Sequence, residues 1–468
     1  MLSKKFESSN EVFSWLSQFI NLESGQTPKS FRLERMETLV ELAGRPDRCA
    51  PSIHIAGSKG KGSITGMMTA CLEAGGSRVA RYMSPHVSDF RERISLGSSF
   101  FDEEAYCAAG DELRELVEQK LPAANCEMFD ANFEEGEAPT YFELLTLLFF
   151  LCARYAKCDA MVVETGMGGR LDSTNVVDPV VSVISLIELE HTKFLGNTIQ
   201  AVAGEKAGII KEGKPLVLAK QCGEVLVVFE KKAAEKHSPL IYFPDIAAVK
   251  DVQVHRNGTN FTLEYHGTVL PLPTLCSPAP RLELSIPIPG QVQAENAGLA
   301  VVALKTAFPH IGEGAIRRGL ENFRIPARFE KIADAPPLII DGAHTPESAA
   351  LCVDTFRSLY GEGGLLLFGC AADKNAQAMA EVLLPYFSKI IITTPGTFKV
   401  SDPEKVYKAF TFVEEQNSKT SEKTVFIKDT AQAIKQALEI ACQKKLPMLC
   451  TGSFYLAAEV RQYSPGGI

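Results

Sequence analysis

A short apolar run that leads straight into a glycine- and lysine-rich turn constrains the fold more than any other feature of the chain. Residues 52–63 read Ser-Ile-His-Ile-Ala-Gly-Ser-Lys-Gly-Lys-Gly-Ser, and a helical pattern continues to about Glu73. This order predicts a buried strand over Ser52–Ala56, a tight turn and a helix. Such a turn offers backbone N–H groups and the positive end of a helix to an anion. The segment therefore predicts an α/β fold with a candidate phosphate site.

The same alternation of short β-branched runs and longer helical segments continues along the chain and predicts mainly parallel sheets. Gly75-Gly76 ends the first helix. Further strands are expected at Val79–Tyr82, Ala160–Val163, Val180–Leu186, within Ile209–Ala219, and at Leu338–Ile340, Leu365–Phe368, Ile390–Thr393, Val425–Ile427 and Met448–Cys450. Helices are expected at Ala294–Ala307, Ala376–Phe387 and Ala431–Lys444. Between Asp251 and Pro289 the alternation of polar and apolar residues predicts a β-meander or hairpin insert.

A chain of 468 residues exceeds one ordinary domain. We place a boundary at Ile325-Pro326, where the second α/β run begins. This divides the chain into an N-terminal phosphate-loop domain, residues 1–325, with a central mainly parallel sheet and a small β insert, and a C-terminal Rossmann-like α/β domain, residues 326–468.

Composition excludes several classes of protein. The net charge of −9 argues against a nucleic-acid-binding surface. Charges stand at the N-terminus where a signal peptide needs an apolar core, and the most apolar run, Leu144–Ala153, is shorter than the roughly 20 residues that span a bilayer. That run predicts a buried helix in a soluble protein without a membrane partner. The twelve cysteines form no C-x-x-C pair and predict reduced, buried thiols in a cytoplasmic protein.

Within the glycine-rich turn, Lys61 is expected to reach the β and γ phosphates of a nucleotide, and Ser63 to support a magnesium ion or a phosphate oxygen. The turn departs from the Walker A pattern, because Ile55 takes the place of its first glycine and Gly62 separates Lys61 from Ser63. A purely structural strand–helix connection is the alternative. Two lysines among three glycines favour phosphate binding, since a structural turn has no use for them.

The form Gly57-x-x-Gly-Lys-Gly-Ser63 resembles the nucleotide loop of folylpolyglutamate and dihydrofolate synthases, within the Mur ligase superfamily. Other segments resemble that family in the same order along essentially the whole chain: Gly25–Met36, Ser84-Pro-His86 with Phe90–Ile94, Thr140–Glu143, Glu164–Asn175, His191–Gly196, Gly204–Lys211, Pro326–Arg328, Asp341–His344, Asp373-Lys374 and Thr451–Ser453. The resemblance implies a Mur-ligase-type ATPase domain followed by a glutamate ligase domain. It implies an enzyme that joins L-glutamate to a folate or dihydropteroate carboxylate through an acyl phosphate. Folylpolyglutamate synthase activity, alone or with dihydrofolate synthase activity, is the expected function.

The resemblance also assigns roles to individual residues. It implies catalytic roles for Lys61, Lys206 and His344 and two magnesium ions with ligands at Ser84, Glu164 and His191. It also implies ATP contacts from Gly60, Lys61, Gly62, Ser63, Asn296, Arg328 and Asp341. Lys206 matches a lysine that carbon dioxide converts to a carbamate. It further implies that Ser30, Phe31, Arg32, Thr140, Tyr141, Phe142, Glu143, Leu171, Asp172 and Ser173 bind the pterin substrate and that Ser453 faces the phosphate or incoming glutamate.

Structural alternatives stand beside several of these roles. Glu164 can be a solvated carboxylate at a strand end, His191 a helix cap or a core residue, and Lys206 an exposed helix lysine. Tyr141 and Phe142 open a very apolar helix and can belong to the core. Arg328 and Asp341, taken alone, are commonplace surface features.

The chain departs from the family pattern at several positions: Ser58-Lys59, Asp89, Glu190, Val292, Ala327 and Thr345. Asp89 reverses a charge beside the expected folate or metal site and is expected to alter substrate choice. Another Mur-type amino-acid ligase and a catalytically silent nucleotide-binding relative are the alternative functions. The expected partners are small molecules only, and the expected state is a monomer.

Overall fold

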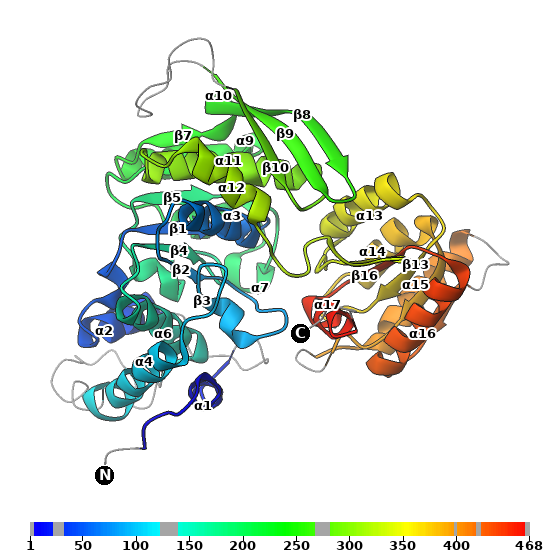
Figure 1. Cartoon of the computed structure of the whole chain (residues 1–468), viewed down its shortest axis with the longest axis horizontal. Coiled ribbons are helices and arrows are strands. Elements are labelled where there is room, and N and C mark those ends of the chain that lie inside the picture. Colours follow the sequence, from blue (N-terminus) through cyan, green and yellow to red (C-terminus); the bar gives the residue numbers. More distant parts are fainter. Residues whose placement is uncertain are drawn as a thin grey trace.

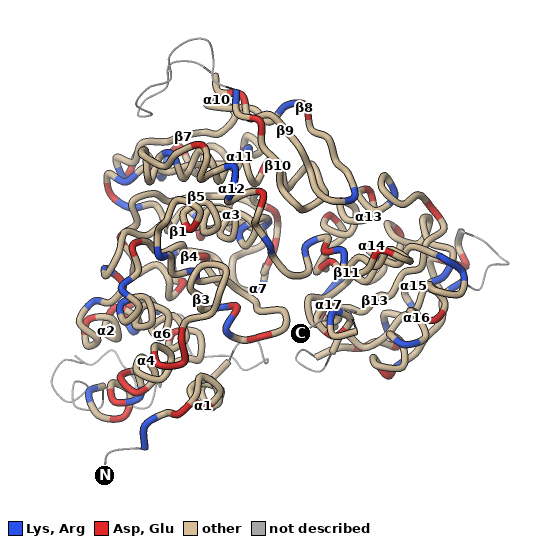
Figure 2. Tube along the Cα trace, viewed as in Figure 1, with Lys and Arg blue, Asp and Glu red and all other residues tan. Residues whose placement is uncertain are grey.

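The computed structural model describes residues 4–21, 32–121, 139–266, 281–396, 400–417 and 423–463. They form a two-domain α/β fold with a small β sheet that packs on the N-terminal domain and reaches toward the C-terminal domain (Figure 1). Acidic and basic residues are interspersed along both domains (Figure 2). The fold confirms the predicted class.

A seven-stranded sheet organises the N-terminal domain. Its strands are β1 (Ser52–Ala56), β2 (Val79–Tyr82), β3 (Ile94–Leu96), β4 (Ala160–Glu164), β5 (Val181–Ile184), β6 (Leu216–Leu218) and β7 (Leu240–Tyr242), in the order β3-β2-β4-β1-β5-β6-β7. Every pairing is parallel except that of β3 with β2. β1 therefore lies at the centre, and its carboxyl end delivers the glycine-rich turn to the middle of the sheet edge.

Helices cover both faces of this sheet. They are α1 (Ser9–Leu16), α2 (Leu33–Leu42), α3 (Lys61–Ala74), α4 (Glu103–Glu115), α6 (Tyr141–Tyr155), α7 (Thr192–Leu195), α8 (Ile199–Ala207), α9 (Gly223–Glu235), α10 (Phe243–Ile246), α11 (Gln291–Ala307) and α12 (Glu313–Asn322). Alternate residues of β4 separate the two cores: Ala160 and Val162 pack with α3, α11 and α12, whereas Met161 and Val163 pack with α4 and α6. Burial on both faces explains the continuous apolar strands.

The predicted insert is an antiparallel sheet of β8 (Ala247–His255), β9 (Gly258–Tyr265) and β10 (Arg281–Ile286), in the order β10-β9-β8. Apolar side chains on one face of β9, among them Phe261 and Leu263, join the core that contains α11. The turn between β8 and β9 points toward the C-terminal domain (Figure 1).

The C-terminal domain is a six-stranded sheet in the order β11-β12-β16-β13-β14-β15. Its strands are β11 (Glu330–Asp334), β12 (Pro337–Ile340), β13 (Gly364–Phe368), β14 (Phe387–Ile392), β15 (Thr424–Phe426) and β16 (Met448–Thr451). Its helices are α13 (Pro346–Tyr360), α14 (Ala376–Leu383), α15 (Pro403–Asn417), α16 (Thr430–Lys444) and α17 (Phe454–Arg461). Only β11 runs antiparallel to its neighbour.

Several predicted bounds were wrong. The helix expected to reach Phe387 ends at Leu383, because Pro385 follows within a short 3-10 turn and Phe387 opens β14. The helix expected from Ala294 begins at Gln291. By contrast, the strand expected within Ile209–Ala219, after Lys211–Lys214, is confirmed as Leu216–Leu218.

The predicted buried helix at Leu144–Ala153 is confirmed as part of α6, whose side chains from Leu144 to Ala153 are all buried. Among the described residues no helix has the length and apolarity needed to cross a bilayer. The ten cysteines in the described part of the chain are free thiols, but Cys49, Cys222 and Cys442 are exposed, so the prediction of uniformly buried thiols was wrong.

Candidate active site

The turn after β1 is shaped by glycines that no other residue could replace without a collision. Gly60 has φ +85°, and a Cβ there would lie 2.5 Å from Oδ1 of Asn296 in α11. Gly57 also has positive φ, at +147°, and a Cβ there would collide with Ser185 at the end of β5. The turn is thus pressed against two neighbouring elements, and Gly60 is the N-cap of α3, where backbone N–H groups favour an anion.

Two lysines converge on one carbonyl oxygen of this turn. Lys61 Nζ and Lys206 Nζ each donate a hydrogen bond to the Gly57 carbonyl oxygen over 2.8 Å. Lys206, on α8, is 1% exposed, so the alternative of an exposed helix lysine is wrong. Burial, helped by nearby Lys61, lowers the pKa of Lys206 to about 8.

Glu190 supplies the counter-charge for Lys206. Its Oε1 lies 2.7 Å from Lys206 Nζ. Although partial burial acts against ionisation, Lys61 and Lys206 hold the pKa of Glu190 at about 2. Glu190 is therefore a carboxylate at any physiological pH, and sequence reasoning recorded it as a departure without giving it a role. The sequence signal for a role of Glu190 was its position directly before His191.

Glu164 ends β4 beside the start of α3. Its side chain is 3% exposed, so the solvated alternative is wrong. The amide of Ser84 donates to its Oε2 over 3.4 Å, and a Cβ at Gly62 would lie 3.6 Å from the same oxygen. Burial raises the pKa of Glu164 to about 7, against the pull of Lys61 and Arg328. Burial disfavours the ionised form of Glu164, and a nearby cation would stabilise that form.

His191 occupies the N-cap position of α7 with φ +47°, but its exposed side chain makes no capping hydrogen bond. Desolvation by the neighbouring protein lowers the pKa of His191, and so do the charges of Lys61 and Lys206. The carboxylate of Glu190 raises it. Among the described residues no three Asp, Glu, His or Cys side chains are gathered as a ready-made metal site. Magnesium accepts few protein ligands because it keeps several waters. Lys61 acts electrostatically on Glu164, Glu190 and His191, so all three lie in the neighbourhood of the glycine-rich turn.

Arg328 and His344 bring the C-terminal domain to this group. The Arg328 guanidinium lies 4.0 Å from the ring centre of Phe454, and Glu164 and Asp341 both raise its pKa against the lowering effect of burial. His344 Nδ1 lies 2.7 Å from the Gly342 carbonyl oxygen. Burial and neighbouring Lys374, Lys59 and Arg328 lower the pKa of His344 to about 3. The imidazole is therefore neutral, with Nδ1 donating and Nε2 an acceptor.

Three further residues with predicted ligand contacts, Asp341 and Ser453 of the C-terminal domain and Asn296 of α11, have local structural contacts. Asp341 accepts hydrogen bonds from the backbone amides of Phe329 at 2.7 Å and Ala343 at 2.8 Å. Ser453 caps α17 by accepting from the Tyr455 amide. Asn296 donates to Gln293 over 3.3 Å while its Oδ1 faces Gly60. Their predicted ligand contacts stay predictions.

Lys59, which the sequence showed only as a departure, joins the two domains directly. Its Nζ donates to Thr345 Oγ1 over 3.0 Å and lies 3.8 Å from Glu188 Oε2. Thr345, the other partner, is also a departure and caps α13. The only sequence signal was an additional lysine within a phosphate loop.

Several of the described residues predicted to bind the pterin already have partners within the N-terminal domain. Glu143 accepts from Arg35 Nε at 2.8 Å and from the amide and hydroxyl of Thr140 at 2.7 and 2.8 Å. Tyr141 is 8% exposed and belongs to the core, and Phe142 packs against the same core. The alternative that these two aromatic residues are core residues is therefore confirmed. The Arg35–Glu143 ion pair and the N-cap residue Thr140 therefore lie at the start of α6.

The second part of that group lies in the turn after β4. Asp172 accepts from the Thr174 hydroxyl at 2.5 Å and the Met167 amide at 2.9 Å, and Ser173 Oγ lies 2.7 Å from Thr146 Oγ1 of α6. Leu171 and Arg32 are partly exposed. Ser30 and Phe31 lie outside the described residues.

Asp89 has a structural role that its charge reversal did not reveal. It caps the 3-10 turn Phe90–Arg93 in a capping box with Glu92, and its Oδ2 lies 2.7 Å from Arg91 Nη2. Its charge is thus neutralised within its own turn, which gives no support to an effect on substrate choice.

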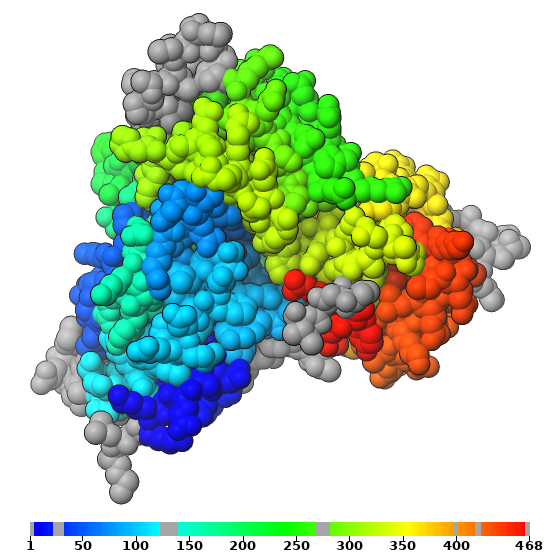
Figure 3. All heavy atoms as spheres, viewed as in Figure 1, coloured from blue at the N-terminus to red at the C-terminus, as the bar shows by residue number. Residues whose placement is uncertain are grey.

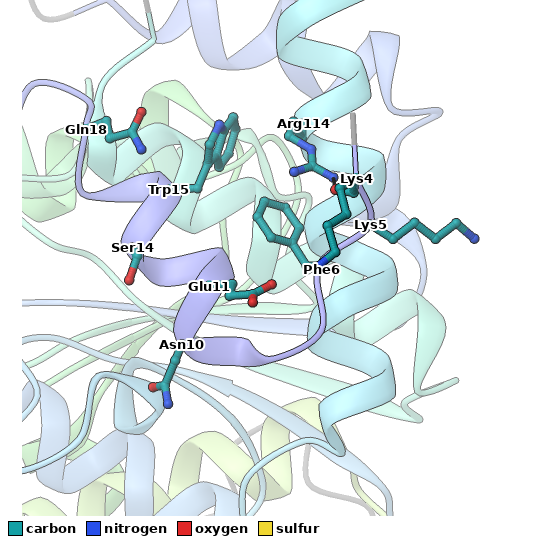
Figure 4. A pocket seen from close by; sticks show the side chains of 9 residues that line it. All are labelled: Lys4, Lys5, Phe6, Asn10, Glu11, Ser14, Trp15, Gln18 and Arg114. Atoms are coloured by element: carbon teal, nitrogen blue, oxygen red, sulfur yellow. Dashed lines mark hydrogen bonds between the residues drawn. The ribbon is translucent and has the colours of Figure 1, made fainter. Parts of the chain in front are cut away.

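A separate pocket of about 490 Å³ opens near the N-terminus, between α1 and α4 (Figure 4). Trp15, Phe6 and Arg114 line it. Arg114 already stacks on Phe6 and bonds Asp111, and none of the predicted site residues contributes to this pocket. The titratable side chains with strongly shifted pKa values, Glu164, Glu190 and Lys206, lie instead around the turn between β1 and α3.

The glycine-rich turn thus lies close to a buried carboxylate, two lysines and an arginine from the second domain. Two family models match: the Mur ligase middle domain over residues 113–304 and the Mur ligase glutamate ligase domain over residues 327–454. The enzyme is accordingly an acid–amino-acid ligase that forms carbon–nitrogen bonds with ATP.

Whole-chain comparisons are more specific. The chain is 33% identical over 439 residues to folylpolyglutamate synthase of Lacticaseibacillus casei, across 92% of this chain and 94% of that protein. It is 31% identical over 436 residues to the dihydrofolate synthase/folylpolyglutamate synthase of Bacillus subtilis, with the same two coverages. The chain belongs to the folylpolyglutamate synthase/dihydrofolate synthase family.

Solved structures agree with this assignment. The apo form of the L. casei folylpolyglutamate synthase gives a TM-score of 0.80 at 29% identity, across 97% of this chain and 99% of that one. The Mycobacterium tuberculosis enzyme complexed with ADP gives 0.82 at 27% identity, across 98% of each chain.

Proposed function

We propose that this enzyme adds L-glutamate to a folate carboxylate, with ATP converting that carboxylate to an acyl phosphate. The observation that carries the proposal is the convergence of Lys61 and Lys206 on the Gly57 carbonyl beside the buried Glu164. A similar folylpolyglutamate synthase has been solved as a complex with AMPPCP and folate, at a TM-score of 0.79 and 29% identity across 98% of this chain and all of that one. Its printed ligands support ATP and a folate as substrates here.

The proposed chemistry has two steps. A carboxylate oxygen of the folate attacks the γ-phosphorus of ATP, which releases ADP and leaves an acyl phosphate. The α-amine of glutamate then attacks the acyl carbon, the bond to phosphate breaks and the amine loses a proton. Both steps develop negative charge on oxygen, which Lys61 and Arg328 are proposed to stabilise as ATP bridges the domains. Asn296 is proposed to contact the adenine and Asp341 the nucleoside.

We assign magnesium binding to Ser84, Glu164 and His191, with two ions as the expected number. Bound magnesium would neutralise the phosphate oxygens. The support from this chain is chemical. Glu164 is a buried oxygen ligand whose pKa is raised to about 7, so a cation would favour its ionised form.

We further propose that Lys206 is carbamylated. Its neutral amine would attack carbon dioxide and lose one proton, which converts a cation into a carboxylate. A pKa near 8 leaves on the order of a tenth of the amine neutral at pH 7, against well under a thousandth for an ordinary lysine. The lowered pKa therefore favours the modification.

On the amino-acid side we assign His344 and Ser453. A neutral imidazole whose Nδ1 is engaged by Gly342 keeps Nε2 available to accept a hydrogen bond from the attacking amine. On the pterin side we assign Ser30, Phe31, Arg32, Thr140–Glu143 and Leu171–Ser173. Whether dihydropteroate is also a substrate follows from the experiment below.

We also propose a domain boundary at 325/326 and a cytoplasmic monomer. The boundary falls between α12, which ends at Asn322, and β11, which begins at Glu330. The ten free thiols of the described residues are compatible with a reducing compartment.

The deciding experiment incubates the purified enzyme with ATP, magnesium and glutamate, and adds a tetrahydrofolate or dihydropteroate. ADP release that requires both glutamate and a folate is expected. Release with dihydropteroate would add dihydrofolate synthase activity. ADP release only with a muramyl substrate, or tight ATP binding without turnover, would overturn the proposal.

A further inference from the structure

The N-terminal domain holds helix α13 of the C-terminal domain at both of its ends. At the first end, Lys59 Nζ donates to Oγ1 of Thr345, the N-cap of α13, over 3.0 Å. At the second end, Arg256 Nε donates to the carbonyl oxygen of Leu359, one residue before the helix ends, over 3.1 Å. Figure 1 shows the β8–β9 turn approaching α13, and Figure 3 shows the green tip of that hairpin against the yellow surface of the helix.

The contact at the first end places a cation against the positive end of a helix. A lysine there gains nothing from the helix dipole, which favours anions at the N-terminus. It is retained by the Thr345 hydroxyl and by Glu188, whose carboxylate lies 3.8 Å away, and its side chain is only 25% exposed. Lys59 is therefore a partly buried residue that links the phosphate loop to the N-terminal end of α13.

The contact at the second end follows the opposite logic. The last carbonyl groups of a helix lack partners within it, and a cation there is favourable. Arg256 occupies one of them, and its guanidinium lies 5.1 Å from the ring centre of Tyr360. The neighbouring Asn257 accepts from Lys331 of β11 over 3.1 Å. The hairpin turn thus contacts the C-terminal domain at two residues, Leu359 of α13 and Lys331 of β11.

These two ends belong to one rigid element whose first turn adjoins the active site. α13 has 15 residues, which corresponds to roughly 22 Å. His344 directly precedes its N-cap, and Lys59 is among the charges that lower the pKa of His344. A helix of this length transmits a tilt at one end to the other, and a displacement of about 1 Å at a reacting group can cost on the order of a hundredfold in rate.

We propose that Lys59 and Arg256 are positioning residues for the ligase reaction: from the phosphate loop and the β insert they hold the two ends of α13 and so fix His344 relative to Lys61. The inference rests on the role proposed above for His344. It gives the three-stranded insert a function, since its hairpin supplies the second of the two supports.

The test compares Lys59→Met, Arg256→Met and the double variant in the full-length enzyme. We measure kcat and KM for ATP and glutamate in the ADP-release assay, and ADP affinity by titration. Each single variant is expected to lower kcat about fivefold and to change ADP affinity less than about twofold. The double variant is expected to lose less than the product of the two single losses, because both act through one helix.

Conservative replacements separate positioning from simple destabilisation. Lys59→Arg and Thr345→Ser keep the donor and the acceptor and are expected to retain kcat, whereas Thr345→Val is not. Arg281→Met is the matched control in the insert, since Arg281 on β10 pairs with Glu264 and does not contact α13. Lys231→Met, an exposed lysine of α9, is the control for loss of a lysine. Should Lys59→Met unfold, Lys59→Gln replaces it.

The outcomes are distinct. Unchanged kcat in either Lys59→Met or Arg256→Met overturns the inference. A weaker ADP affinity with retained kcat in Lys59→Met also overturns it, because Lys59 would then hold the nucleotide and not the helix. A wild-type enzyme without folate- and glutamate-dependent ADP release would instead contradict the proposed function.

Discussion

Lys61 and Lys206 donate hydrogen bonds to the same oxygen atom, the carbonyl of Gly57, each over 2.8 Å. They reach it from different helices, α3 and α8. Among the described residues one carboxylate, Glu190, lies within ion-pair distance of Lys206, at 2.7 Å. Two ammonium groups at one oxygen repel each other, so this arrangement gains stability from an anionic ligand or from conversion of one amine to a carbamate.

Replacement of Lys206 by alanine tests that second possibility. We expect Lys206→Ala to lower kcat at least about a hundredfold, because catalysis would lose a group that becomes a carboxylate. ADP affinity should stay within about threefold, since Lys61 keeps its place in the loop. Lys211→Ala is the control, because Lys211 Nζ bonds the Asn175 carbonyl at 2.6 Å, away from Gly57. Near-normal turnover of Lys206→Ala, or no uptake of isotope-labelled bicarbonate by the wild type in mass spectrometry, would remove the carbamate.

Gly60 offers a test of the phosphate loop. We expect Gly60→Ala to weaken ATP binding more than about tenfold, since a Cβ would lie 2.5 Å from Asn296 Oδ1 and the residue has φ +85°. Gly76→Ala is the matched control, because Gly76 has φ +91° and nothing within 4 Å of its Cβ position. Both variants carry the backbone strain, but only the first carries the collision. Isothermal titration with ADP measures the difference, and equal affinities in the two variants would contradict the assignment.

Glu164 predicts a pH-dependent stability. The apo enzyme should lose unfolding free energy relative to Glu164→Gln as pH rises from about 4.5 through 7, because the folded state binds a proton over this range that the unfolded state has released. Above pH 7 the variant should be more stable by up to about 3 kcal/mol. Urea unfolding at pH 5 and pH 8 measures this difference.

Excess magnesium should reduce the disadvantage of the wild type at pH 8 and leave Glu164→Gln nearly unchanged, since a bound cation favours the carboxylate. Wild-type and variant stabilities that run parallel from pH 5 to pH 8 would show that the raised pKa of Glu164 is absent. A magnesium effect equal in both proteins would place the ion elsewhere.

The buried pair of Arg35 and Glu143 predicts a large effect on stability. We expect Glu143→Gln to lower the free energy of unfolding by about 3 kcal/mol, because Arg35, only 5% exposed, loses a carboxylate at 2.8 Å. Glu112→Gln is the control: its partner Arg154 is 34% exposed, and the loss should stay near or below about 1 kcal/mol. Equal losses in urea unfolding would contradict the assignment of Arg35–Glu143 as a buried structural pair.

Local sequence signals predicted the elements whose burial is continuous. β12 and β13 read as apolar runs because helices cover both faces of their sheet, β1 and β2 were predicted although Ser52, His54 and Arg81 interrupt them, and the β insert was evident from its alternation. The short strands β3, β7 and β11 were not predicted. They have three to five residues and depend on pairing with a neighbour along the sheet, which leaves little trace in their own composition.

The sequence by itself determined the chemical types at the site: glycines where the turn needs positive φ, lysines beside it and a carboxylate at a strand end. Only the tertiary structure decided their state. The buried Lys206 pairs with the partly buried Glu190, Asp341 accepts hydrogen bonds from local amides, and Lys59 bonds Thr345 across 286 residues of chain. The physical reason is that burial and charge pairing arise from packing between distant segments, whereas turn geometry and strand periodicity are properties of neighbouring residues.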